Sequence, residues 1–396
     1  MLVPLLPVTL ARGVSTHVLL GTAPQCAPVH RIATATHQTA PAPQGFAENA
    51  TGGVGGPHVQ VTSLADSGEG TLRVAATAEG PSVVEFAVNG TIRLDSPIMV
   101  TANKTISGRS AAITITGAGL NMSGVSNVII ECLTVKDAAE DAISVRDGAT
   151  DIVLRHLTLG PCGDGLLDVT MATNATLTRV SVEHCLFDGG DKVMLVGASN
   201  DALNDANLAI SISHSWFRIC WQRTPRLRFG RAHIWNCLYS DWGGYAVSSG
   251  FGGRLLVESS VFRAGERPEA SKVMDAVLGA LRGESNALEQ GAFVTDQSPE
   301  LVPRNASTWY DYDCEQNTTL VALDVEANAG WHLRAAGMES VPPSDAEPPA
   351  ESPAESPAAP PVAPPVELTA NQTWACLFLT LLIISGVSCK KRRCPP

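Results

Sequence analysis

Aromatic residues are scarce in this sequence, at 5% of 396 positions, and basic side chains are outnumbered by acidic ones, 27 against 39. Glycine, valine, isoleucine, serine and threonine are abundant instead, which favours turn-rich β structure over helix. The net charge of -12 argues against a general nucleic-acid binder, because the chain would repel a polyanion at long range. A polyanionic ligand would need a local basic patch or a bridging cation.

Paired-cysteine metal spacing is also missing. None of the ten cysteines forms a Cys-x-x-Cys motif, so a zinc site of that kind is not indicated. Cys376, Cys389 and Cys394 lie near the C-terminus, which leaves seven cysteines for the rest of the chain. An odd number implies at least one free thiol, or the loss of Cys26 with a leader peptide.

Uninterrupted apolar runs are rare, and the clearest is Trp374 to Cys389, directly followed by Lys390-Lys-Arg-Arg393. We expect a transmembrane helix at 373–389 with a basic cytosolic tail at 390–396, hence a single-pass type I membrane protein with an extracellular ectodomain. A host plasma membrane and a viral envelope both remain open. Residues 341–372 are rich in proline and alanine and predict a disordered stalk, and 1–44 a leader and an extended entry segment.

Eight Asn-x-Ser/Thr acceptor motifs predict a secreted glycoprotein. Ordinary strand and turn chemistry is the alternative explanation for Asn103 and Asn174. The predicted glycosylation sites are therefore Asn49, Asn89, Asn121, Asn305, Asn317 and Asn371.

Between Ser126 and Ala264 an internal repeat emerges, with short β-rich segments that align without gaps. Its units begin at Glu131, Arg155, Glu183, Ser213, Trp235 and Glu258. This period suits the coils of a parallel β-helix, in which each coil buries its apolar face by stacking on its neighbours. We expect an all-β parallel β-helix over 45–265, then a C-terminal wrap over 266–340 that covers the end of the stack and has helical spacing from Arg267 to Leu281.

Counting forward from each repeat unit places four charged residues on consecutive coils: Asp141, Asp164, Lys192 and Arg223. Because equivalent positions in neighbouring coils lie about 4.8 Å apart, they should form one strip. A solvated charge ladder is the alternative, but the signs are sorted, acids before bases, and this favours a functional site.

Polar residues also recur at one turn position: His156, His184, His214, Asn236 and Ser259. We interpret this column as an internal hydrogen-bond ladder in preference to a metal site. Cys185 and Cys237 share a neighbouring position, but Ser215 lies between them, so a disulfide is not expected.

Several motifs, in order and nearly in spacing, resemble the plant-like pectate lyases. They are Gly124-Val-Ser-Asn-Val-Ile-Ile130, Asp141-Ala-Ile-Ser144, Asp164-Gly-Leu-Leu-Asp168, Asp191-Lys-Val-Met-Leu-Val-Gly197 and Arg223-Thr-Pro-Arg-Leu-Arg-Phe-Gly230. The resemblance covers roughly Gly45 to Ala335 and implies a right-handed β-helix.

Carried over residue by residue, the resemblance implies a calcium ion (Ca2+) held by Asp141, Asp164 and Asp168. Lys192, Arg228 and Arg226 would bind the uronate carboxylate, and Arg223 would be the base. The implied reaction is β-elimination in a 4-linked uronic-acid polysaccharide, with pectate as the family's usual substrate. Cations around the carboxylate would lower the barrier, because negative charge builds on a group that is already anionic.

Two positions depart from the family pattern, since Arg155 and Ala139 stand where acidic residues are usual. With the membrane anchor, they motivate an alternative, an inactive acidic-glycan-binding membrane or envelope glycoprotein. The complete set of Lys192, Arg223 and Arg228 favours the enzyme, because a binding module has little need of a base.

Overall fold

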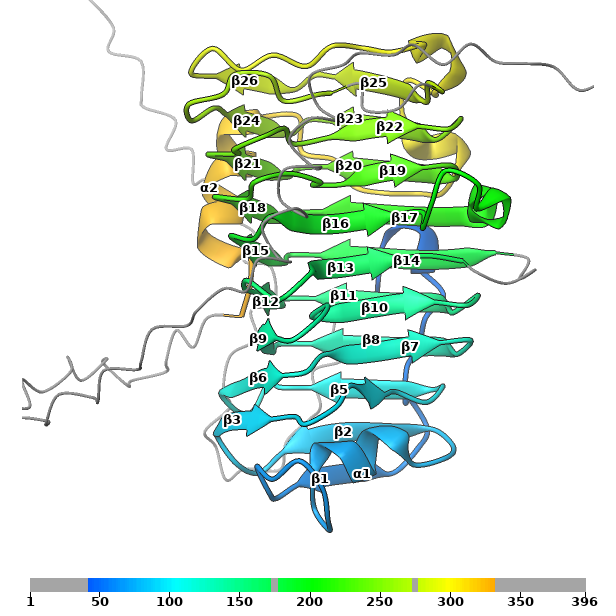
Figure 1. The fold of residues 1–396 in the computed structure, drawn as a ribbon, viewed down its shortest axis with the longest axis vertical. Coiled ribbons are helices and arrows are strands. Elements are labelled where there is room, and N and C mark those ends of the chain that lie inside the picture. The colour runs from blue at the N-terminus through cyan, green and yellow to red at the C-terminus, as the bar shows by residue number, and fades with distance from the viewer. Residues whose placement is uncertain (1–41, 172–176, 273–276, 332–396) are drawn as a thin grey trace, which may run out of the picture. The chain divides into compact units, whose positions relative to one another are not determined.

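A computed structural model describes residues 42–171, 177–272 and 277–331, and these form a parallel β-helix (Figure 1). Each coil contributes a strand to up to three sheets, which run the length of the stack. Named strands pair in parallel throughout the described residues, as expected when each coil repeats the path of the one before it. The predicted β-helix is therefore confirmed.

The ten-stranded sheet contains the repeat units recognised in the sequence. Arg155 pairs with Glu131 and Glu183, and Glu183 pairs with Ser213, so the gap-free alignment is confirmed. The strands are β1 (His58–Val61), β2 (Ser82–Phe86), β5 (Lys104–Ser107), β8 (Ser126–Glu131), β11 (Thr150–Arg155), β14 (Thr178–Glu183), β17 (Leu208–Ser213), β20 (Arg231–Trp235), β23 (Arg254–Glu258) and β25 (Ala280–Glu284).

The other two sheets have seven and nine strands in the described residues. The seven-stranded sheet contains β4 (Ile98–Met99), β7 (Leu120–Ser123), β10 (Ile143–Arg146), β13 (Gly165–Val169), β16 (Lys192–Val196), β19 (Arg226–Arg228) and β22 (Ser248–Gly250). The nine-stranded sheet contains β3 (Gly90–Arg93), β6 (Ile113–Gly117), β9 (Thr134–Ala138), β12 (Thr158–Leu159), β15 (Leu186–Asp188), β18 (Trp216–Arg218), β21 (Leu238–Ser240), β24 (Val261–Arg263) and β26 (Ala287–Glu289).

The few aromatic residues are concentrated inside the stack. Phe187, Phe217, Tyr239 and Phe262 occupy one buried column, and successive rings lie 4.6, 4.8 and 4.5 Å apart between centroids. Aliphatic side chains from all three sheets complete this continuous core. A repeating coil thus builds a large core from few aromatic residues, because like side chains stack on like.

Short helices cover the surfaces of the stack. Helix α1 (Leu72–Thr77) packs Leu72 and Ala76 into the core beside β1 and β2, and the Thr71 hydroxyl accepts a hydrogen bond from Val74 N–H at its start. Helix α2 (Thr318–Asn328) buries Val321 and Val325 against the nine-stranded sheet. Four 3₁₀ turns complete the described helices: η1 (Gly45–Ala47), η2 (Leu203–Asn207), η3 (Pro299–Leu301) and η4 (Ala306–Thr308).

Three expectations for the C-terminal part are wrong. The coils do not end at Gly265, because β25 and β26 add strands to two sheets, and Ala280 and Leu281, the end of the segment with expected helical spacing, belong to strand β25. The segment that follows lies along the sides of the stack instead of over its end. Tyr310 packs with Trp235 and Phe46 on the ten-stranded sheet, while α2 covers the nine-stranded one.

The predicted turn column is present, but it is built by ring stacking. His156, His184 and His214 all have positive φ, a left-handed turn conformation in which histidine is more common than bulkier residues. Their rings stack at 4.9 and 4.7 Å between centroids. Asn236, the next member, does donate hydrogen bonds, to the carbonyls of Ser259 and Glu315.

The cysteines agree with the predicted separation of Cys185 and Cys237, which are both buried and free. Burial raises the pKa of each thiol to about 12, so both are inert. Cys132 is disulfide-bonded.

None of the helices in the described ranges is long and apolar enough to cross a membrane. The predicted stalk, span and tail, together with Asn371, lie outside the described residues. Asn49, Asn89, Asn305 and Asn317 are exposed, and glycosylation stays a prediction.

Candidate functional site

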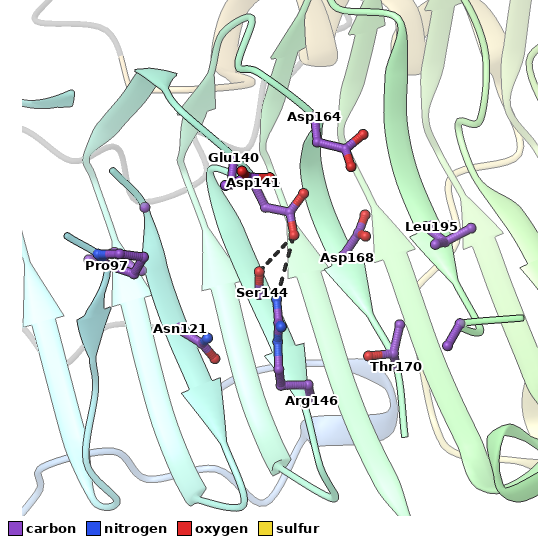
Figure 2. Close-up of a pocket in the computed structure, with 13 residues that line it drawn as sticks. Pro97, Asn121, Glu140, Asp141, Ser144, Arg146, Asp164, Asp168, Thr170 and Leu195 are labelled. Carbon is purple, nitrogen blue, oxygen red and sulfur yellow. Dashed lines mark hydrogen bonds and ion pairs between the residues drawn. The ribbon is translucent and has the colours of Figure 1, made fainter. Parts of the chain in front are cut away.

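An acidic cleft of about 570 Å³ lies on the outer face of the seven-stranded sheet, over β7, β10 and β13. It is lined by Asp141, Asp164 and Asp168, the three carboxylates singled out from the sequence. Figure 2 shows these side chains gathered around one space, with Arg146 reaching toward Asp141. Residues 24 or more positions apart meet here because each coil returns the chain to the same face.

Gly165, at the start of β13, lies next to two of the three carboxylates. A Cβ atom at Gly165 would lie 2.7 Å from Asp168 Oδ1 and 3.1 Å from Asp141 Oδ1, so both carboxylates point over the missing side chain. The Gly165 N–H also donates a hydrogen bond of 3.0 Å to Asp141 Oδ1, which fixes that carboxylate in place. The absence of a side chain at Gly165 therefore lets the two carboxylate oxygens approach the same point.

The convergence of the carboxylates makes the charged form of Asp168 less favourable. Burial, and then the neighbouring charges of Asp141 and Asp164, raise the pKa of Asp168 to about 7, against a smaller opposing effect of Arg223 and the Leu195 N–H. Three carboxylates that repel one another, in a cleft with few cations, form an environment that a bound cation would stabilise.

The donor set fits calcium in its chemistry, because it consists of carboxylate and hydroxyl oxygens. The side chains are not closed around an ion, since no three His, Cys, Asp or Glu side chains in the described ranges are positioned to hold a metal. Lys192 Nζ instead lies 2.8 Å from Asp164 Oδ1, and Ser144 Oγ donates to Asp141 Oδ2 at 2.9 Å. A calcium ion would compete with these partners for the same oxygens.

The predicted basic residues lie on the coils that follow the three carboxylates, beginning with Lys192 on β16. The Asp164 carboxylate raises the pKa of Lys192 through their hydrogen bond. Arg223 is close enough to Asp168 and Lys192 to influence both electrostatically, and its Nε is buried without a hydrogen-bond partner. Its backbone has φ 63°, and its carbonyl accepts a hydrogen bond from Met194 N–H. This left-handed conformation is uncommon for an arginine.

Arg226 and Arg228 lie on β19, one strand beyond Lys192. Arg226 pairs with Leu195, which in turn pairs with Asp168, so these three side chains follow one row across the sheet. Arg228 donates to the carbonyl oxygens of Gly197 and Ala198. The three arginines lie beyond the lining of the acidic cleft, so the predicted residues form two adjoining groups, acidic and basic.

Two of the register partners predicted by counting from the repeat units are wrong by one residue. Gly165, not Asp164, pairs with Lys192, and Lys192 pairs with Gln222, not Arg223. Turns of different length shift the register between coils, which counting from the repeat units did not include. Asp164 still reaches Lys192, because both side chains lie at the start of their strands.

Four further residues of the cleft were missed: Asn121, Glu140, Ser144 and Arg146. Asn121 Oδ1 is buried and has no hydrogen-bond partner, and a glycan on this predicted acceptor would occupy the cleft. Arg146 Nη2 lies 3.6 Å from Asp141 Oδ2. Alternate side chains of a strand point to the outer face of the sheet. Applying this alternation to β7 and β10 could have located Asn121, Ser144 and Arg146.

The fold and the cleft together define a parallel β-helix protein with an acidic site and adjoining basic residues on one sheet. The sequence profile of the family Pectate lyase matches residues 22–333, which is more than half of the chain, and the chain belongs to this family.

Individual relatives agree with this assignment. A probable pectate lyase of Solanum lycopersicum is 32% identical over 251 residues, covering 56% of this chain and 62% of the relative. Pectate lyase 5 of Ambrosia artemisiifolia is 29% identical over 301 residues, covering 67% and 75%. This chain thus spans less than two thirds of the tomato relative. The crystal structure of jun a 1, the major allergen from cedar pollen, has a TM-score of 0.65 at 25% identity, covering 72% of this chain and 92% of that one.

Proposed function

We propose that this protein is a calcium-dependent polysaccharide lyase that cleaves 4-linked uronic-acid polymers, with pectate as its substrate. The observation that carries the proposal is the convergence of the Asp141 and Asp168 oxygens near Gly165, with basic residues on the next two strands of the same sheet, β16 and β19. A structural neighbour from Bacillus sp. N165, 21% identical, was solved in complex with trigalacturonate, which supports the choice of substrate.

The residues have complementary roles in this reaction. Asp141, Asp164 and Asp168 would hold calcium, which supplies positive charge for the substrate carboxylate. Lys192, Arg226 and Arg228 bind and orient that carboxylate from the other side. Their charges stabilise the anion that forms when the α proton leaves.

Arg223 accepts the proton from C5 of the uronate. The C5–H electron pair forms the C4–C5 double bond, and the C4–O bond breaks. The leaving sugar departs with its oxygen, which takes up a proton from water, and an unsaturated uronate remains. Arginine is an unusual base because its guanidinium holds its proton strongly. Lys192 lies close enough to Arg223 to interact with it electrostatically, and Arg226 and Arg228 follow Arg223 in the chain, on β19.

The test is the rise in ultraviolet absorbance of the unsaturated product when the protein is mixed with polygalacturonate and calcium. We expect the rise to stop with chelator, and Arg223→Lys to lower turnover by about 10²- to 10⁴-fold while polymer binding persists. Gly165→Ala would raise the calcium concentration needed for turnover, because the new methyl group fills the space between the carboxylates. Turnover that persists in Arg223→Lys, or that ignores chelator, would contradict the proposed roles.

We further propose that the lyase is tethered to a membrane through 373–389 and carries N-linked glycans, on the strength of the apolar run, the basic tail and the acceptor motifs. Expression in a eukaryotic cell, followed by alkaline extraction and peptide N-glycosidase treatment, tests both points. A full chain that is released from membranes as readily as a chain ending at 372 would rule out the tether. An unchanged mass after glycosidase treatment would rule out the glycans.

A further inference from the structure

A second cleft, of about 300 Å³, lies at the corner where the seven-stranded sheet turns into the ten-stranded one. Two arginines and three aromatic residues line it, together with small residues: Arg231, Arg254, Phe229, Phe251 and Trp309. It belongs to later coils than the acidic cleft, and the two share no lining residue.

The aromatic wall is built at a conformational cost. Phe229 and Phe251 follow β19 and β22 at equivalent turns, with φ 58° and 49°, and their rings lie 5.6 Å apart between centroids. A bulky side chain in the left-handed region is a marked exception, and earlier coils place Gly124 and Asp147 at the corresponding turns. Backbone strain of this kind suggests that the aromatic side chains serve a purpose other than the turn itself.

The basic wall has no acidic partner among the described residues. Arg231 and Arg254 are register partners on β20 and β23, so their backbones are about 4.8 Å apart. Arg231 Nε is buried without a hydrogen bond, and the guanidinium lies 5.1 Å from the centre of the Phe46 ring. Asp205, on the nearby 3₁₀ turn η2, accepts hydrogen bonds from the N–H groups of Met171 and Ala198.

Arg231 is also electrostatically unfavourable as it stands. Burial, followed by the charge of Arg254, lowers the pKa of Arg231. A bound anion would offset both effects, because it neutralises two adjacent guanidinium groups that carry planar, paired donors.

We propose that this corner cleft is a second, non-catalytic binding site for an acidic sugar of the polymer. Arg231 and Arg254 bind its carboxylate, and Phe229, Phe251 and Trp309 contact the apolar face of its ring. The choice of an acidic sugar over another aromatic or anionic ligand rests on the proposed function. The site contains no carboxylate in its lining, so it needs no bridging calcium, and in this it differs from the acidic cleft.

The experiment measures binding of fluorescently labelled trigalacturonate to the full chain in excess chelator, which removes the calcium-dependent contribution of the acidic cleft. Two variants address the site. Arg254→Gln removes an exposed cation, and Phe251→Asn places a residue that tolerates positive φ at the turn. Arg93→Gln is the matched control, because Arg93 is an exposed arginine on β3 for which the described residues provide no ion-pair partner.

We expect chelator-resistant binding that weakens about tenfold in Arg254→Gln and Phe251→Asn and is unchanged in Arg93→Gln. Equal binding by all variants, no chelator-resistant binding, or displacement by adenosine monophosphate at the same concentration as by galacturonate would overturn the proposal. The lyase assay on the unaltered chain separates the two hypotheses. Calcium-dependent turnover without chelator-resistant binding would contradict the second-site proposal alone. Chelator-resistant binding that depends on Arg254, without turnover, would contradict the proposed lyase function alone.

Discussion

Two strips of charged side chains cross neighbouring coils of this β-helix, one on each of two sheets. On the ten-stranded sheet Glu131, Arg155 and Glu183 are register partners with exposed fractions of 3%, 6% and 9%. On the seven-stranded sheet Asp141 and Asp168 face Asp164 across an open cleft, where Asp164 has a side chain that is 45% exposed. The same coil geometry thus produces both strips, and the order of the signs distinguishes them.

In the buried strip the signs alternate. Arg155 Nε and Arg109 Nε each donate to Glu131 at 2.7 Å. Burial alone would raise the pKa of Glu131, but the hydrogen bond and charges from these arginines lower it to about 2. In the cleft Asp141, Asp164 and Asp168 carry the same negative charge. Burial and the two neighbouring carboxylates raise the pKa of Asp168 to about 7. A charge ladder that is paired and buried stabilises the fold, whereas like charges held together in a cleft indicate a ligand site.

This comparison also resolves the departure at Arg155. In the sequence, Arg155 in place of an acid was one of two departures that motivated the alternative of an inactive glycan-binding protein. Arg155 instead ends β11 on the ten-stranded sheet, where its Nε donates to Glu131 at 2.7 Å and Glu183 is its other register partner. Arg155 is therefore not among the residues that line the acidic cleft.

The largest expected effect comes from breaking the buried strip with Glu131→Gln. Its carboxylate binds Arg155, Arg109 and Ser107 in the interior, so its loss leaves buried positive charge uncompensated. We expect the free energy of unfolding to fall by about 3–5 kcal/mol, measured with chemical denaturant. Lyase turnover per folded molecule should be unaffected.

Asp168→Asn is the matched change in the cleft. It should leave the stability intact and abolish turnover, the opposite of Glu131→Gln. It removes a carboxylate that is disfavoured by burial and by two like charges, so the stability in the absence of calcium should be unchanged or slightly higher. Turnover should be lost. A loss of several kcal/mol in Asp168→Asn, or none in Glu131→Gln, would contradict the distinction between the two strips.

The stacked histidines predict a smaller, pH-dependent effect. Burial, assisted by the charges of Arg109 and Arg155, lowers the pKa of His156 to about 4 from an ordinary value of 6.5. The unfolded chain therefore takes up a proton at a higher pH than the folded one. The contribution of His156 to stability is complete above about pH 6.5 and falls by about 3 kcal/mol as the pH drops to about 4.

Unfolding of the unaltered chain alone cannot test this, because buried Glu183 has an opposite effect. Burial raises the pKa of Glu183 to about 7, so its contribution grows as the pH falls over the same interval. The measurement is therefore the difference in unfolding free energy between the unaltered chain and His156→Asn, since Asn236 shows that asparagine fits this turn. A difference that does not change between pH 7 and pH 4 would show that the buried column is not kept neutral.

The sequence allowed the coils to be predicted because stacking repeats the same position every coil, so Glu131, Arg155 and Glu183 align by inspection. It did not allow the register of the cleft to be predicted, because turns of unequal length place Gly165, not Asp164, opposite Lys192. Counting from the repeat units placed Asp141 and Asp164 in one strip, and the resemblance to pectate lyases added Asp168 and the proposed calcium role of all three. The role of Gly165 required coordinates, because a glycine of ordinary φ gives no local signal that two distant oxygens meet above it.

Arg146 was also missed in the sequence, although the alternation along β10 could have located it, and it supports the smallest of the predicted effects. It is the cation in the lining of the acidic cleft, and its guanidinium lies 3.6 Å from an Asp141 oxygen that calcium would use. Arg146 has a side chain that is 41% exposed, so this pair is worth about 1 kcal/mol or less. Competition of that size would raise the calcium requirement by no more than about fivefold.

Arg146→Gln should therefore lower the calcium concentration for half-maximal turnover by about two- to fivefold and leave maximal turnover unchanged. Arg179→Gln is the control, because Arg179 forms a comparable, partly exposed pair with Asp151 on the ten-stranded sheet. An unchanged calcium requirement with a higher KM would instead make Arg146 a substrate-binding residue, because its guanidinium would then neutralise a uronate carboxylate next to the calcium site. In that case the acidic cleft would contain an alternating order of signs when substrate is bound, as the buried strip does permanently.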